Sequence, residues 1–339
     1  MTTDGTYDDT TPLAREIADI TRRRMALEAR AFPLPESTRV ITVSNQKGGV
    51  GKTTSVMNLG AALARAGHQV LLMDLDPQAH LSIAFNRMPD PGDPSVYSLL
   101  SGQHQIVDVA QPTNLEDLFI APTNLDLTGA EQEFASEIGR ETLLRDALER
   151  LAASDGAPDV VLLDCPPTLG LLSLNALCAS DAVIIPVQAE FFALQGMAQL
   201  LDVLERVQRR LNPRLQLLGI LVGMYSKQRN LSREVVDELR GHFGEVVFST
   251  LIRVNVRLAE APSHGMTIFE YDAQSAGAAD FAAVAAELSE RLGLQAPLDQ
   301  PTEPESAAEP KAEEPAAQPE AAAPEAPAEP PVEATAEQA

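Results

Sequence analysis

A glycine- and lysine-rich run at residues 45–54 is the part of the sequence best suited to chemistry. It reads Asn-Gln-Lys-Gly-Gly-Val-Gly-Lys-Thr-Thr and follows the short β-rich run Arg39–Ser44. Glycines let several backbone N–H groups turn toward one anion, and a helix beginning near Thr53 adds the positive end of its dipole. The run therefore predicts a phosphate-binding loop built from Lys47, Gly48, Gly49, Val50, Gly51, Lys52, Thr53 and Thr54.

Three side chains of this loop have predicted tasks with ATP and Mg²⁺. Lys52 is placed to reach the β- and γ-phosphates, the Thr53 hydroxyl to ligate Mg²⁺, and Thr54 to reach the α-phosphate. The loop departs from the usual pattern at its start, where Gln46 replaces a glycine and Lys47 adds a second lysine. The alternative interpretation is a glycine turn with two solvated lysines.

Carboxylates follow two apolar runs further along the chain. Asp74 and Asp76 end the run that begins at Val70, and Asp164 ends the run that begins at Val160. The carboxyl ends of parallel strands border the nucleotide crevice in α/β folds. Either run alone could be an ordinary strand end capped by an acid, but the order loop, acid, acid favours a nucleotide site in which Asp164 holds Mg²⁺.

The elements needed to position these residues alternate along the chain. Continuous apolar runs predict strands covered on both faces, and they are separated by helical patterns. This alternation predicts an α/β fold with a doubly wound, mostly parallel sheet and helices on both faces. The expected strands are Val40–Ser44, Gln69–Asp74, Asp117–Ala121, Val160–Asp164, Ala182–Val187, Leu217–Met224 and Val246–Leu251, and the expected helices Thr53–Ala66, Glu141–Ala152, Leu171–Ala179, Ala193–Arg210, Ser232–His242 and Ala276–Leu292.

Composition divides the 339 residues into three segments. Residues 1–38 are expected to form an N-terminal extension with a short helix near residues 12–31. Residues 39–296 are expected to form a globular α/β domain that contains the phosphate-binding loop, and residues 297–339 an acidic tail rich in Pro, Ala and Glu. The tail has too few apolar groups to offset chain entropy, so we expect it to be disordered. The formal net charge of −24 argues against a protein whose whole surface binds polyanions.

The two cysteines, Cys165 and Cys178, offer neither a disulfide framework nor metal-ligand spacing. The N-terminus has no signal-peptide pattern, and no apolar run approaches the length of a membrane span. We therefore expect a cytoplasmic protein.

The sequence resembles the ParA/Soj chromosome-partitioning ATPases, within the larger MinD/ParA family of deviant Walker A P-loop proteins. The resemblance covers about residues 38–293. It rests on five motifs, of which the last two are more specific to the partitioning branch: Asn45–Thr54, Asp74–Gln78, Asp164–Pro167, Ile185–Gly196 and Asn255–Gly265.

The resemblance implies a role for each matching residue. Lys47 matches the signature lysine, which contacts phosphates bound by the other subunit of an ATP-sandwich homodimer. Lys52 and Thr53 match the P-loop lysine and the Mg²⁺ ligand, Asp76 the aspartate that positions the attacking water, and Asp164 the Walker B acid. A catalytic lysine supplied by a second subunit implies slow ATP hydrolysis by the monomer. The family also implies a ParB-type centromere-binding partner and association with the nucleoid.

The resemblance further implies non-specific binding to DNA, which an acidic protein can achieve only through a local basic surface. The stretch Val203–Arg257 holds ten basic residues against five acidic ones. Arg257 matches the DNA-contacting arginine of the family's Asn-Val-Arg motif. A second family arginine precedes an Asn-Leu pair, but here it is shifted by one position, so Lys227, Arg229 and Arg233 are all candidates. The alternative is a set of solvated helix faces.

Three other functions share parts of this pattern. A MinD-like membrane ATPase needs a basic amphipathic C-terminal helix, whereas this C-terminus is acidic and proline-rich, so we expect no membrane binding. An iron-protein reductase needs two cysteines on separate loops, and these cysteines are predicted to lie elsewhere. An ATPase that positions another cargo, such as a protein assembly, shares the chemistry and remains an alternative.

Overall fold

The computed structural model describes residues 15, 18–21, 23, 35, 37–190 and 193–293. By its internal contacts the chain divides into residues 1–296 and residues 297–339. The second unit, for which the sequence predicts a disordered acidic tail, lies outside the described residues. Of the predicted N-terminal helix, residues 15, 18–21 and 23 are described, and they are helical.

A seven-stranded sheet forms the centre of the first unit. The strand order is β3-β4-β2-β5-β1-β6-β7, and every neighbouring pair is parallel except β3 and β4. The predicted α/β fold with a mostly parallel sheet is therefore confirmed. The strands are β1 (Arg39–Val43), β2 (Val70–Asp74), β3 (Gln111–Pro112), β4 (Leu118–Ala121), β5 (Val160–Asp164), β6 (Ala182–Gln188) and β7 (Gln216–Gly223).

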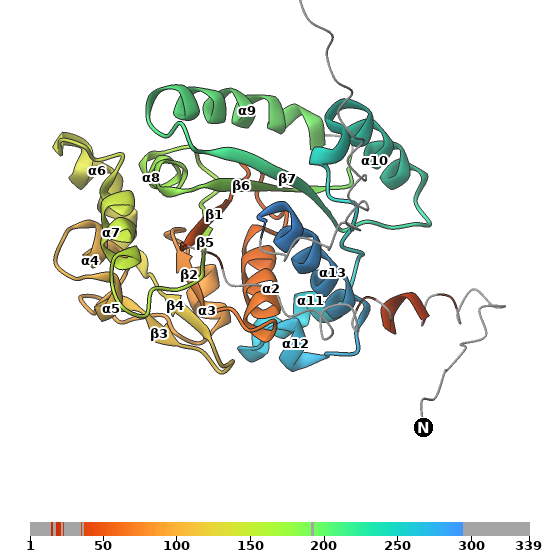
Figure 1. Ribbon diagram of the computed structural model, residues 1–339, viewed down its shortest axis with the longest axis horizontal. Helices are drawn as coiled ribbons and strands as arrows, with labels where there is room; N and C mark the ends of the chain where they lie inside the picture. The colour runs from red at the N-terminus through yellow and green to blue at the C-terminus, as the bar shows by residue number, and fades with distance from the viewer. Residues whose placement is uncertain are drawn as a thin grey trace, which may run out of the picture. The chain divides into compact units, whose positions relative to one another are not determined.

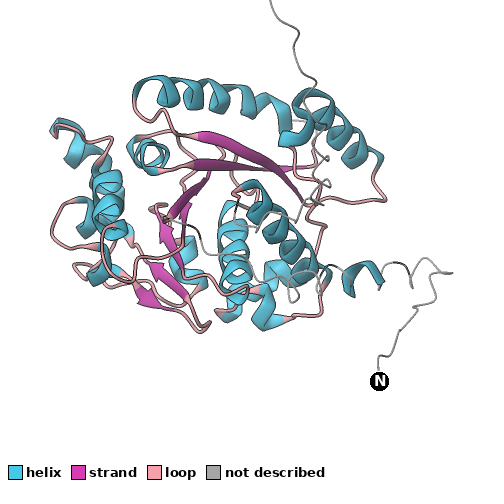
Figure 2. Ribbon diagram, viewed as in Figure 1, coloured by secondary structure: helices cyan, strands magenta, loops and turns pink. Residues whose placement is uncertain are grey.

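Helices cover both faces of this sheet (Figures 1 and 2). On one face α2 (Lys52–Arg65), α3 (His80–Ala84), α11 (Val256–Glu260), α12 (Ile268–Tyr271) and α13 (Ala276–Arg291) pack against alternate strand residues such as Ile41 and Leu72. The other face is covered in two parts: by α4 (Val96–Leu100), α5 (Ile106–Val109), α6 (Ala130–Glu133), α7 (Leu143–Ala152) and α8 (Leu171–Ala179), and by α9 (Ala193–Arg210) and α10 (Asn230–Phe243).

The central strands β2 and β5 are buried at every residue, as their continuous apolar sequences predict. Their side chains alternate between the two layers of helices, so Leu72 and Leu162 pack on one face and Leu71 and Val161 on the other. The pairing register places Asp74 beside Asp164, and Asp164 beside Val43. The ends of β1, β2 and β5 that carry the predicted site therefore lie at one edge of the sheet.

The predicted strand Val246–Leu251 is wrong. The chain forms a 3₁₀ turn at Gly244–Val246 and makes one isolated bridge, between Val247 and Ile220. The Phe248 N–H donates to the Ile220 carbonyl of β7 at 2.9 Å, but the two N–H groups after it, those of Ser249 and Thr250, donate to the carboxylate of Glu287 on α13. A side chain thus satisfies donors that a strand would pair with a neighbouring strand, which explains why an apolar run does not extend the sheet.

Candidate nucleotide-binding site

The glycine-rich loop connects β1 to α2 at the carboxyl edge of the sheet. Gly49 and Gly51 have φ angles of +74° and +90°, a region that L side chains rarely adopt. A side-chain carbon at Gly48, Gly49 or Gly51 would meet no described atom within 4 Å, so the loop borders open space. The loop therefore has both the backbone conformation and the room that a phosphate group requires.

The N-terminus of α2 opens onto this space. Gly51 is its N-cap residue and has no side chain to cap the first N–H groups, and the first turn contains no acid. Unsatisfied N–H groups and the positive end of the helix dipole together favour an anion at this position. Lys52, the first residue of α2, is 8% exposed. The arrangement is that of a phosphate site with a buried ammonium group beside it.

Asp164 is fully buried at the end of β5, and neither of its carboxylate oxygens has a hydrogen-bond partner among the described residues. Burial raises the pKa of Asp164 well above its ordinary value, and the neighbouring charge of Asp74 raises it further. The nearby Thr53 hydroxyl and Lys52 ammonium act in the opposite direction. A buried carboxylate without donors is unfavourable unless a cation satisfies it, so Asp164 and Thr53 fit a Mg²⁺ site.

Asp74 and Asp76, the two acids after β2, differ in their partners. Asp74 is fully buried and accepts hydrogen bonds from the backbone N–H (2.8 Å) and hydroxyl (2.7 Å) of Ser82. Burial raises the pKa of Asp74 to about 7, against the effect of these bonds. Asp76 is 7% exposed and accepts one bond, from the Gln78 N–H at 3.0 Å. Asp74 therefore anchors α3, whereas Asp76 keeps one carboxylate oxygen without a hydrogen-bond partner among the described residues. No local pattern in the sequence indicated the role of Ser82.

Lys47 lies in the glycine-rich loop, but its side chain forms an ion pair with a residue outside the loop. Its ammonium nitrogen is 3.1 Å from a carboxylate oxygen of Glu190, which follows β6, and both side chains are exposed. Asn45 fixes the start of the loop: its amide donates to the Pro186 carbonyl at 2.7 Å and its oxygen accepts from the Lys47 N–H. An exposed ion pair contributes little stability. Lys47 can therefore leave Glu190 at small free-energy cost.

An apolar pocket of about 360 Å³ adjoins the loop. Gly51 and Thr54 form one side of it, and the segment Ile252–Val256 forms another. The wall includes the exposed apolar side chains Met224 and Val254. Its size and apolar lining suit a flat ring system placed next to the phosphate site.

The four candidate DNA-binding residues are all exposed. Lys227 and Arg229 lie between β7 and α10, and Arg233 lies in the first turn of α10, where it bonds the Asn230 side chain. Arg257, on α11, is 3.1 Å from Glu260 and 3.7 Å from Asp272 and stacks over the Tyr271 ring. These four are retained as candidates.

Other arginines of the stretch Val203–Arg257 make contacts that stabilise the fold. Arg253 is bound to the buried Asp280, Arg240 donates to the Ser249 carbonyl, and Arg206 and Arg209 form ion pairs within α9. A parallel bridge joins Tyr225 to Arg253, so the segments before Lys227 and before Arg257 run side by side.

The two cysteines are buried, Cys165 after β5 and Cys178 within α8. Burial raises the pKa of both thiols, that of Cys178 to about 11. Because a metal ligand must be a thiolate, neither position suits a shared cluster at a surface.

Comparison with known proteins identifies the family. A family model described as an AAA domain matches residues 38–217. The chain is 47% identical over 259 residues to the chromosome-partitioning ATPase Soj of Thermus thermophilus, covering 76% of this chain and 98% of that protein. The chain belongs to the ParA/Soj family of chromosome-partitioning ATPases. Another ParA/Soj relative, the chromosome partitioning protein ParA of Caulobacter vibrioides, is 44% identical over 253 residues, or 75% of this chain and 94% of that protein.

The ParA/Soj fold also matches a solved structure with nucleotide in place. Cobyrinic acid a,c-diamide synthase from Mycobacterium smegmatis, with bound ATP analog and magnesium, superposes with a TM-score of 0.66 at 37% identity, covering 76% of this chain and 96% of that one. The P-loop ATPase family predicted from the Asn45–Thr54 motif is therefore confirmed.

Proposed function

We propose that this chain is an ATP-driven switch that dimerises with ATP, binds DNA without sequence preference, and releases it after hydrolysis stimulated by a ParB-type partner. The observation that carries the proposal is the buried carboxylate of Asp164, which has no described hydrogen-bond partner and lies near Thr53 and Lys52 at the open glycine loop. Because the chain belongs to a family of partitioning ATPases, we infer that the cargo moved by this switch is a chromosome or plasmid.

The nucleotide is positioned by the two parts of the site. Its phosphates lie on the glycine loop and the N-terminus of α2, and its adenine lies in the apolar pocket beside Thr54 and Val254. Thr53 and Asp164 would hold Mg²⁺, directly or through water, which neutralises charge on the phosphates. Phosphoryl transfer needs little covalent help, so positioning and positive charge supply most of the catalysis.

Hydrolysis is divided between two chains in this proposal. Asp76 positions the attacking water, and Lys52 neutralises charge on the phosphates of its own subunit. Lys47 acts on the phosphates bound by the partner subunit, which supplies charge at the transition state only in the dimer. The pairing of Lys47 with Glu190, away from its own loop, supports this division because the lysine is exposed and exchangeable.

DNA binding is assigned to Arg257, Arg229, Lys227 and Arg233. The carboxylates of Glu260 and Asp272 beside Arg257 make it a weak phosphate ligand in the isolated chain, so several residues from two subunits must act together. Such contacts position a protein on the DNA backbone and carry no sequence information.

A sedimentation assay separates this function from that of a membrane-bound relative. The protein is mixed with linear DNA or with anionic liposomes, in the presence of ATP or ADP with Mg²⁺. We expect co-sedimentation with DNA in ATP only, and none with liposomes. Among the residues that the structure describes, no helix is long and apolar enough to cross a membrane. ATP-dependent sedimentation with liposomes but not DNA would contradict the proposal.

A further inference from the structure

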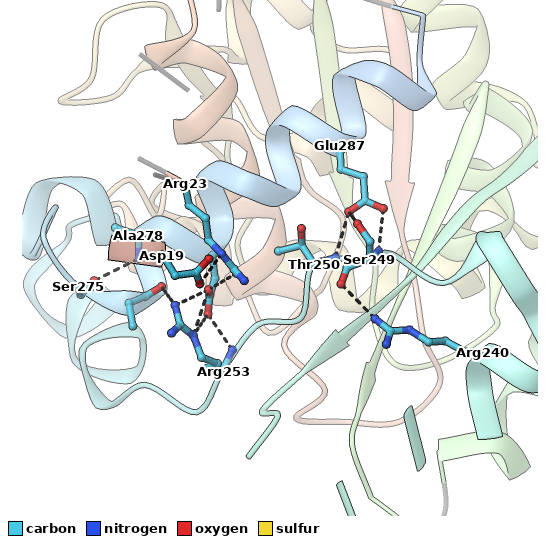
Figure 3. Close-up of polar contacts among 11 residues, drawn as sticks. Asp19, Arg23, Arg240, Ser249, Thr250, Arg253, Ser275, Ala278 and Glu287 are labelled. Carbon is cyan, nitrogen blue, oxygen red and sulfur yellow. Dashed lines mark hydrogen bonds and ion pairs between the residues drawn. The ribbon is translucent and has the colours of Figure 1, made fainter. Parts of the chain in front are cut away.

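The carboxylate of Asp280, on α13, joins two arginines that are distant in the sequence, Arg23 and Arg253, both labelled in Figure 3. Asp280 is fully buried, and Arg253 donates to it from Nη2 (2.7 Å), from Nε (2.9 Å) and from its backbone N–H (3.0 Å). Arg23, which lies 257 positions before Asp280, donates to the same carboxylate at 2.9 Å. The N-terminal extension therefore shares one carboxylate with the segment that follows β7.

The second arginine exceeds what the buried charge requires. A bidentate arginine already neutralises Asp280, and most of the carboxylate's capacity is used by Arg253. Arg23 is nevertheless oriented for this contact, because Asp19, one helical turn earlier, is 3.0 Å from its Nε. Ala18 on the same helical segment is buried at 9% exposure. The described residues 18–21 and 23 thus contact the ATPase domain at a defined point.

Arg253 lies in the wall of the nucleotide pocket. It lines the apolar pocket together with Val254 and Asn255, and Asn255 caps α11, which carries Arg257. Two turns along α13 from Asp280, Glu287 holds Ser249 and Thr250 (Figure 3). The segment from Ser249 to Asn255 is therefore held on α13 at two carboxylates, and Arg23 touches one of them.

We propose that Arg23 is a positioning residue for nucleotide binding: through Asp280 it fixes Arg253 and the pocket wall in the conformation that binds the base. This inference rests on the proposed location of the base in the apolar pocket. Without Arg23, water reaches the Asp280 carboxylate and competes with the Arg253 guanidinium, so the wall samples other positions. Coupling between two sites is reciprocal, so bound ATP also strengthens the docking of residues 18–23.

Fluorescence titration with a labelled ATP analogue and Mg²⁺ tests this coupling in the full-length chain. We expect R23A to weaken binding roughly 5- to 10-fold, within the usual range of coupling between sites. R23K keeps one charged donor and should recover most of the affinity. The matched control is R145A, because Arg145 has a similarly exposed side chain (33% against 31%) with ion pairs to Asp146 and Glu149 on the opposite face of the sheet. R145A should bind like the wild type.

Hydrogen exchange on the unmodified protein gives a second test. If the contact of Arg23 were purely structural, exchange near it would not change when nucleotide binds. Amides of residues 18–23 should exchange more slowly with ATP and Mg²⁺ than without nucleotide. Unchanged affinity in R23A together with unchanged exchange would overturn the inference and leave the proposed function intact. Failure of the wild type to bind the analogue would instead overturn the proposed nucleotide site, and the coupling with it.

Discussion

The buried carboxylate of Asp164 lowers the stability of the fold but leaves two oxygens available to a cation. Among the described residues no donor lies at hydrogen-bonding geometry to this fully buried carboxylate, which makes it unfavourable for the fold, and burial raises its pKa despite the nearby Thr53 hydroxyl. Asp74, its neighbour on β2, has three donors and serves the fold. This difference supports the proposal that Asp164, and not Asp74, binds the cation.

We therefore predict opposite effects on stability and activity for Asp164→Asn. The uncharged amide removes the buried charge, so the melting temperature without nucleotide should stay equal to that of the wild type or rise. ATP hydrolysis should fall by at least roughly 100-fold, because Mg²⁺ loses a ligand. Differential scanning fluorimetry and a phosphate-release assay measure the two effects. A variant that is less stable yet fully active would show that Asp164 is structural.

Lys47 and Glu190 permit a matched pair of substitutions. Lys47→Ala should bind ATP within about twofold of the wild type, because its ammonium group is bound to Glu190 and not to its own loop. The ATP-dependent dimer and stimulated hydrolysis should be lost. Glu190→Gln frees the lysine and should dimerise at least as well as the wild type. Analytical ultracentrifugation with ATP measures both, and a normal dimer in Lys47→Ala would refute the role in trans.

At the scale of elements, α13 determines where the pocket wall lies. Its carboxylates Asp280 and Glu287 bind the segment Ser249–Asn255, which borders the glycine loop and bonds to β7 through the Ile252 N–H, donating to the Val222 carbonyl at 2.9 Å. Burial acts to raise the pKa of Glu287, but hydrogen bonds from Ser249, Thr250 and Arg291 outweigh it, so the pKa lies below its ordinary value. The ionised form of Glu287 therefore stabilises the fold.

Glu287→Gln tests this attachment. Hydrogen bonds to a charged group contribute about 1.5–3 kcal/mol, so the variant should lose stability in that range at neutral pH. Because the pKa of Glu287 is lower in the folded chain, its contribution is present above the unfolded-state pKa of about 4.5 and is lost as the pH falls through the folded value. Urea unfolding should show the two proteins converging in acid. A difference that is constant with pH would contradict the role of the charge.

Sequence patterns predicted the elements that local chemistry dictates. The loop at Gly48–Gly51, the apolar strands ending at Asp74 and Asp164, and the long helices all follow from local residue types. The prediction of a strand at Val246–Leu251 failed because the N–H groups of Ser249 and Thr250 donate to Glu287, nearly 40 residues away, instead of to a neighbouring strand. The short helices α3 to α6, α11 and α12 were not predicted, since four- and five-residue helices leave no periodic signal.

Sequence patterns named candidate residues for the site but did not indicate their contacts. Nothing in the sequence indicated that Arg253 forms an ion pair with Asp280, or that Arg23 of the N-terminal extension donates to the same carboxylate. Long-range pairs of this kind depend on how helices pack, and a single sequence does not encode them in any local pattern.

At the scale of the whole molecule, charge limits where DNA can bind. The chain has a formal net charge of −24, and several arginines of the stretch Val203–Arg257 are neutralised by nearby acids. The proposed DNA binding therefore relies on a second copy of the chain, which would double the number of exposed cations that face one DNA molecule. ATP controls DNA binding in this account because it controls dimerisation.

Fluorescence anisotropy with a labelled duplex of arbitrary sequence, at two salt concentrations, tests this claim most directly. With ATP and Mg²⁺ the wild type should bind, the affinity should fall steeply with salt, and Arg257→Glu should reduce the log–log slope by about one per lost phosphate contact. With ADP the affinity should fall by at least roughly tenfold. Equal affinity with ATP and ADP, or binding that is independent of salt and of Arg257, would contradict the account.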